Sequence, residues 1–214
     1  MMTELAIYLP GILLSYSAFL LAIASPGPNV MAIVGTSMAV GRRQGMSLAM
    51  GVAIGSLTWG LLTVIGLSAL LTQFAYGLIA LKIFGGFYLL WLSYKAFKSA
   101  RANADLKAKE LAGGRRTGFG YFARGFLIQM TNPKAALAWI AIISLGLSSE
   151  APAWVGMVIL SGTFVLSLII HTLYALAFST KGMVSVYVKA RRWIQGTFSV
   201  FFALAGLKLL TSKN

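Results

Sequence analysis

Two short proline-containing motifs are the residues of this chain best suited to bind a small polar molecule. The first is Ser25-Pro26-Gly27-Pro28-Asn29 and the second is Thr131-Asn132-Pro133-Lys134, and each interrupts a long apolar run. Proline has no amide hydrogen and its ring clashes with the carbonyl four residues earlier, so a helix entering either motif must stop, kink or restart. We therefore predict a broken helix at each motif.

The ends of broken helices carry backbone groups that can bind a ligand. A restarted helix points amide N–H groups and a partial positive charge at the break, which suits a carboxylate. Asn132 before Pro133 has the sequence of an N-cap, and Gly27 before Pro28 is a smaller version. Each proline also removes a helical donor from the carbonyl four residues earlier, which leaves an acceptor for an ammonium group. The predicted substrate-binding residues are Ala24, Pro26, Gly27, Pro28, Asn29, Gln129, Asn132, Pro133 and Lys134.

A site with donors at one pole and acceptors at the other suits a zwitterion, so we expect a free amino acid as the small-molecule partner. Lys134 adds a cation, and an unpaired charge at the centre of a bilayer costs about 3 kcal/mol or more. It either binds the substrate carboxylate and takes part in gating, or it is satisfied by carbonyl oxygens. His171 is the only side chain that titrates near neutral pH without a shift. It is either a coupling residue that carries protons or a residue that bonds between helices.

The residue types that the chain lacks exclude other chemistry. All four acidic residues, Glu4, Asp105, Glu110 and Glu150, lie outside the apolar runs, so no carboxylate is expected to neutralise a dibasic substrate. The sequence has one histidine and no cysteine, which removes the usual metal ligands and nucleophile–base pairs. We expect no catalytic residues, no metal and no cofactor, and therefore no enzyme.

Long apolar runs determine the fold class. Hydrophobic residues make up 58% of the chain and charged residues 10%, and the segments between the runs are short. A membrane-spanning helix needs about 20 apolar residues. Six runs are near or above that length, at about residues 5–40 (interrupted by the first motif), 46–71, 76–97, 119–147, 154–178 and 193–210. We predict an all-α membrane protein with six transmembrane helices that form a single domain over residues 1–214.

Basic residues predict the orientation of this domain. The net charge of +14 comes from residues at the ends of the runs, which is typical of membrane topology and not of a nucleic-acid-binding face. They cluster at Arg42 and Arg43, in a loop at about 99–118 and at 181–192. We expect these three connections in the cytoplasm and both termini outside, with the lipid bilayer as a partner and no nucleic acid.

The order of features repeats within the chain. A constant offset aligns Pro28 with Pro133, Gly51 with Gly156 and Thr58 with Thr163. The interpretation is two three-helix repeats, at about 1–98 and 119–214, each with a broken first helix and joined by the basic loop. Because three spans is an odd number, the second repeat must be inverted.

Small residues at four-residue spacing form a strip in the second apolar run. They are Ser47, Gly51 and Gly55. Such a strip lets another backbone approach closely. The partner is either a helix of the same chain or a second copy in a homodimer.

The motifs Pro26-Gly27-Pro28-Asn29, Gly41-Arg42-Arg43-Gln44-Gly45-Met46 and Asn132-Pro133-Lys134-Ala135-Ala136 together resemble the LysE/RhtB family of bacterial amino-acid exporters. The likeness covers nearly the whole chain. It implies amino-acid efflux across the bacterial inner membrane, driven by the proton-motive force. Two alternatives stay open: an exporter of a related small amine or organic metabolite, and a membrane assembly protein that does not transport.

Overall fold

The chain folds into helices throughout the part that the structure describes. The computed structural model describes residues 2–25, 27–73, 77–101, 117–147, 151–178 and 181–211. The regular elements in these ranges are α1 (Met2–Ala24), α2 (Pro28–Ala39), α3 (Arg42–Gln73), α4 (Gly77–Arg101), α5 (Gly118–Met130), α6 (Pro133–Gly146), α7 (Ala153–Ala177) and α8 (Lys181–Thr211). The predicted all-α class is confirmed.

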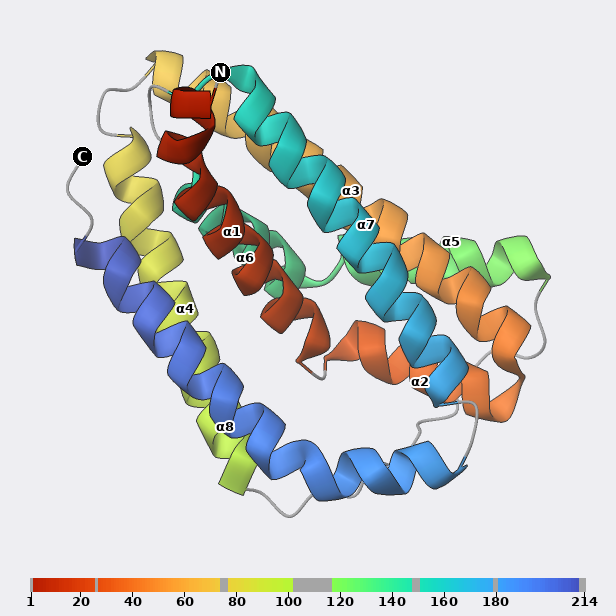
Figure 1. Ribbon diagram of the computed structural model, residues 1–214. Helices are drawn as coiled ribbons and strands as arrows, with labels where there is room; N and C mark the ends of the chain where they lie inside the picture. The colour runs from red at the N-terminus through yellow and green to blue at the C-terminus, as the bar shows by residue number, and fades with distance from the viewer. Residues whose placement is uncertain are drawn as a thin grey trace.

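Both proline motifs break a helix where the sequence predicts it. The first proline-starting helix, α2, begins at Pro28 after α1 ends at Ala24, and α6 begins at Pro133 after α5 ends at Met130. The axes of α5 and α6 are bent by 64° at their break. Figure 1 shows that α1 and α2 also meet at an angle. A broken helix followed by two long helices thus occurs twice along the chain.

Fewer spans meet a strict test of length and hydropathy than the six that the sequence predicts. Among the described residues, four stretches qualify: Ala6–Ala24, Arg42–Gly66, Ala153–Ala177 and Arg192–Thr211. The bent pair α5 and α6 gives a fifth if it is counted as one span. Helix α4 has 25 residues but is not among them. The membrane class is supported by these spans and by large apolar side chains exposed on the outer helix faces, such as Phe84, Phe87 and Leu204.

The last helix starts earlier than expected. The sequence interpretation assigns residues 181–192 to a connection, but the structure includes them in α8, which is 31 residues long. Apolar residues between the basic ones allow the helix to extend beyond the span, and Figure 1 shows α8 changing direction along its length. Most of the predicted basic loop at 99–118 lies outside the described residues.

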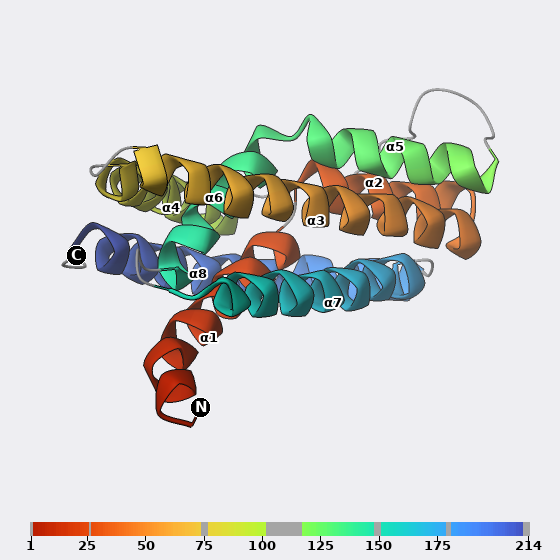
Figure 2. The same cartoon turned by 90° about the horizontal axis from the view of Figure 1, so that it is seen from above.

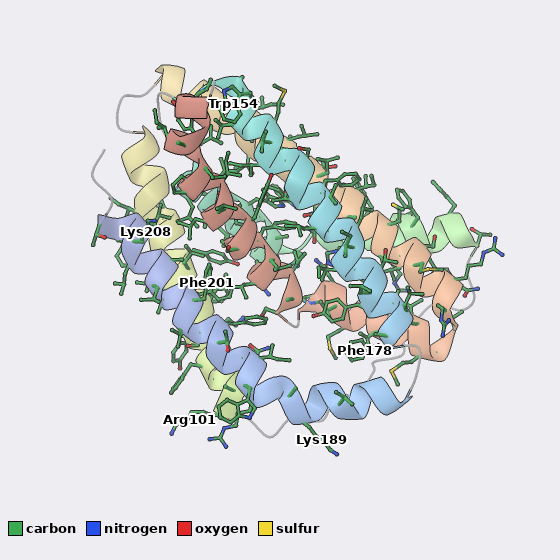
Figure 3. The ribbon with its side chains drawn as sticks, viewed as in Figure 1. Arg101, Trp154, Phe178, Lys189, Phe201 and Lys208 are labelled. Atoms are coloured by element: carbon green, nitrogen blue, oxygen red, sulfur yellow. The ribbon has the colours of Figure 1, made fainter. Side chains whose placement is uncertain are left out.

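Two helix pairs enclose a central pair. Helix α3 packs on α7 and α4 packs on α8, while α1 and α6 contact each other between them (Figure 1). Seen from above, α2 and α5 lie on the same side of the molecule as α3, and α7 and α8 lie on the other side (Figure 2). This arrangement brings the ends of α1 and α5 to the interior. Arg101 and Lys189 lie at one edge of the molecule, away from Trp154 (Figure 3).

The strip of small residues packs inside the chain. A Cβ atom added at Gly51 would lie 1.9 Å from the carbonyl oxygen of Phe122 in α5. One added at Gly125 in α5 would lie 2.1 Å from the carbonyl oxygen of Leu48 in α3. Ser47 Oγ donates to the carbonyl of Gly118 at 2.5 Å. The strip therefore positions α5, and with it the second break, against α3.

Candidate functional site

The two helix breaks meet at one cavity, although they are about a hundred residues apart in sequence. Ser25, Gly27 and Asn29 from the first break line it together with Gln129, Asn132 and Lys134 from the second. Asn29 Nδ2 donates directly to Gln129 Oε1 across the two breaks. The cavity is small, about 40 Å³, which is room for roughly three water molecules at ~10–15 Å³ each.

The helix restart at the first break has no side-chain cap. Gly27 is the N-cap residue of α2, in an extended conformation, and Pro28 occupies the first helical position. Because glycine offers no side-chain oxygen, no cap bond is made to the amide groups of the first turn of α2. Gly27 and Asn29 both line the cavity. The uncapped positive end of α2 therefore lies at the cavity.

The restart at the second break is capped. Asn132 is 7% exposed, and its Oδ1 accepts a hydrogen bond from the amide of Lys134 at 3.0 Å. The carbonyl of Asn132 also accepts from the amide of Ala135 at 2.9 Å. The N-cap that the sequence predicts is confirmed, and it occupies amide groups that would otherwise face a ligand. The two breaks thus differ, because α6 has a side-chain cap and α2 has none.

The two carbonyls predicted to be open acceptors each have a protein donor. Tyr174 Oη donates to the carbonyl of Ala24 at 2.9 Å. Trp59 Nε1 donates to the carbonyl of Gln129 at 3.2 Å. The expectation that these oxygens lack partners is wrong, because aromatic side chains from other helices replace the donors that the prolines remove. A carbonyl has two lone pairs, so the oxygen of Ala24 keeps capacity for a second donor.

Lys134 bridges the two breaks. Its ammonium Nζ donates to the carbonyl of Ala22 at 3.3 Å and to that of Ser25 at 3.4 Å, both at the end of α1. A Cβ added at Gly27 would lie 3.6 Å from the same Nζ, so the charge is beside the uncapped start of α2. The backbone of Lys134 is held as well, since its carbonyl accepts from Tyr88 Oη at 2.8 Å. In this state Lys134 is satisfied by carbonyl oxygens, one of the two interpretations from the sequence.

His171 lies at the same cavity. It is 2% exposed and lines the cavity from α7. Its Nδ1 is 2.9 Å from the carbonyl of Ser167 and 3.1 Å from the Ser167 hydroxyl, one turn earlier on the same helix. These hydrogen bonds are within α7, and among the described residues His171 shows no bond to another helix, in contrast to the interhelical interpretation.

The cavity has a polar half and an apolar half. The polar half consists of the breaks, and the Oδ1 of Asn29 is buried there without a partner among the described residues. The apolar half is formed by Phe19 of α1 together with Ala138, Trp139 and Ile142 of α6. Such a division suits a ligand with a charged head and an apolar side chain. Among the described residues no group of three or more His, Asp or Glu side chains lies close enough to hold a metal.

Sequence reasoning missed the aromatic donors around the site. Trp59, Tyr88 and Trp139 all lie well inside apolar runs, and each donates a hydrogen bond in the interior. The signal was available, because a hydroxyl or indole N–H in the middle of a span cannot bond to water and must find a protein acceptor. Of the predicted substrate-binding residues, only Pro26 lies outside the described residues. The others lie at the breaks, and those that line the cavity are Gly27, Asn29, Gln129, Asn132 and Lys134.

Comparison with known proteins supports this arrangement as that of a transporter. The LysE type translocator family matches residues 20–213. The chain is 28% identical to the uncharacterized membrane protein YahN of Escherichia coli (strain K12), over 94% of this chain and 90% of that protein. It is 26% identical to the threonine efflux protein of Escherichia coli (strain K12), over 91% of this chain and 94% of that protein. It is 30% identical to the leucine efflux protein of Enterobacter sp. (strain 638), over 54% of each.

No solved structure matches the chain. The family match covers nearly all of the sequence and includes both helix breaks and the cavity between them. The resemblance inferred from the proline motifs is therefore confirmed. The chain belongs to the LysE type translocator family.

Proposed function

We propose that this protein is a secondary active exporter of small, neutral amino acids in the bacterial inner membrane. Family membership and relatives named for threonine and leucine efflux support amino-acid export. The observation that carries the proposal is the position of Lys134. Its ammonium group lies beside the uncapped start of α2, in a cavity that both helix breaks line.

The substrate carboxylate would bind at this positive pole. The first amide groups of α2 have no side-chain cap. Among the described residues, Lys134 Nζ is held by long contacts to the carbonyls of Ala22 and Ser25, at 3.3 and 3.4 Å. A carboxylate offers the ammonium a shorter, charge-assisted bond and can displace these carbonyls. Asn132 keeps a structural role as the cap of α6.

The substrate ammonium would bind at the amide side chains of the breaks. Asn29 Oδ1 is a buried acceptor without a partner among the described residues, and it lies beside Gln129. A neutral amino acid satisfies both poles. A dibasic one would bring a second cation into a cavity whose described lining contains no carboxylate, which favours neutral cargo.

In this proposal, two inverted repeats give alternating access. The helix contacts support such repeats, because most contacts have a counterpart when α1, α2 and α3 are exchanged with α5, α6 and α7. The contact of α3 with α5 corresponds to that of α7 with α1, and the contact of α1 with α6 corresponds to that of α5 with α2. A cavity of about 40 Å³ is too narrow for a whole amino acid, so a transport cycle requires one repeat to move against the other.

The proton-motive force would drive export, with His171 as the coupling residue because it faces the same cavity. The basic ends of α4 and α8 would be cytoplasmic and both termini outside. A homodimer would need a surface other than the strip at Gly51, which is used within the chain.

Uptake into inverted membrane vesicles tests the proposal. Vesicles that contain the wild-type protein should accumulate radiolabelled threonine or alanine faster than vesicles without it, and the P28A variant should lose most of this activity. A panel of neutral amino acids without any cargo for the wild type would contradict the proposal and favour a membrane protein that does not transport.

A further inference from the structure

One face of α6 forms a wall of the cavity, and the side chains on this face become larger along the helix. Ala135, Ala138, Trp139 and Ile142 all line the cavity, at the spacing that places residues on one side of a helix. The two alanines leave room beside Lys134 and the polar pole. Trp139 is five residues beyond Lys134, about 7.5 Å along the helix. The wall is therefore open near the charged groups and closed farther along.

Trp139 cannot move out of the way easily. It is 2% exposed, as is Ser56, and its Nε1 donates to Ser56 Oγ at 3.2 Å. The ring centroid of Phe19 is 5.2 Å from that of Trp139. On a third side, a Cβ added at Gly60 of α3 would lie 2.8 Å from Trp139 Cη2. A hydrogen bond, an aromatic ring and a helix backbone thus fix the indole in place.

We propose that Trp139 sets the upper limit on the size of the substrate side chain. The inference rests on the proposed amino-acid export and assigns the substrate class: the charged head group binds at the helix breaks, and the side chain points along α6 until it meets the indole. Once the repeats have moved apart to admit the substrate, the side chains of alanine, serine and threonine fit in front of the indole, whereas those of leucine and phenylalanine do not. Trp139 acts by contact with the side chain and takes no part in binding the head group.

Exchange in liposomes tests this limit without any need for a proton gradient. Purified protein is reconstituted into liposomes loaded with unlabelled threonine, and entry of radiolabelled threonine is inhibited by external alanine, serine, valine, leucine or phenylalanine. For the W139L variant, the half-inhibitory concentration of leucine relative to that of alanine should fall at least about 10-fold. That is the lower end of the discrimination that one methylene group gives in an apolar pocket.

Two further variants test the same limit. A138V narrows the same wall without removing a hydrogen bond, and it should raise the leucine-to-alanine ratio. W193L makes the same chemical change as W139L at a side chain that is 81% exposed, and it should leave the ratio unchanged.

The outcomes separate this inference from the proposed function. If the wild type exchanges no amino acid, both fail. If the wild type exchanges threonine but the ratio is unchanged in both W139L and A138V, only the size limit is refuted, and Trp139 is a packing residue. If W139L does not assemble, W139F and A138V still decide, because they must shift the ratio in opposite directions.

Discussion

Replacing Lys134 by methionine removes the cation that we assign to the substrate carboxylate. A hydrogen bond to a charged group is worth about 1.5–3 kcal/mol. The ammonium must give up the carbonyls of Ala22 and Ser25, whose contacts of 3.3 and 3.4 Å are longer than an ideal bond and worth about 0.5 kcal/mol each. The net loss of about 0.5–2 kcal/mol corresponds to a roughly 2- to 30-fold weaker affinity.

Comparing two ligands that differ in the carboxylate makes the measurement specific for the contact between Lys134 and that group. Binding of radiolabelled threonine to purified protein is competed by unlabelled threonine and by threonine amide, which has no carboxylate. The K134M variant should weaken binding of threonine by the amount above and change binding of the amide less than about 2-fold. K208M makes the same substitution at an exposed position in α8 and should change the binding of neither ligand.

Two results would refute this reasoning. Unchanged threonine affinity in a K134M protein that is folded would show that Lys134 only ties α6 to the end of α1. An equal loss for threonine and its amide would show that the substitution distorts the cavity as a whole.

Three further outcomes follow from the structure. G51V should destabilise the purified protein by about 1–3 kcal/mol and lower its melting temperature, because the new side chain would meet the carbonyl of Phe122 in α5. G66V, at a position with nothing within 4 Å, should leave the melting temperature unchanged. Equal melting curves for the two variants would contradict the packing of α5 against α3. N132A should destabilise the protein by about 1 kcal/mol through loss of the α6 cap, whereas N132D should retain most of the wild-type stability. The same midpoint of chemical denaturation for N132A and N132D would contradict the role of this cap. H171N should retain threonine exchange but lose acceleration by an imposed pH gradient in liposomes, whereas a normal response to the gradient would remove His171 from coupling.

The sequence predicts helix breaks well because proline acts locally. Pro28 and Pro133 each begin a helix, as their missing amide hydrogens require. The capping role of Asn132 follows from its residue type and position in the same way. Most boundaries of the apolar runs agree with the helices for a similar reason, since hydropathy and length alone determine them.

Features that depend on contacts between distant segments could not be predicted. The Ala24 carbonyl has Tyr174 as a donor from 150 residues away, and no local pattern indicates that pairing. The bond between Asn29 and Gln129 likewise requires the relative position of two helix ends. The length of α8 was underestimated because basic residues at 181–192 suggested a connection, although charge is compatible with a helix outside the apolar layer.

The most direct test asks whether the two breaks form one binding site. The chain contains no cysteine, so single cysteines can be placed at Ser25 in the first break and at Ala135 just after the second, both of which line the cavity. A small, water-soluble thiol reagent should label both positions, and threonine should protect both with the same half-maximal concentration. Arg43, exposed at the start of α3 in a connection expected in water, serves as a control position that the reagent should label and that threonine should not protect. Protection at only one break, or at different concentrations of threonine, would contradict a shared site.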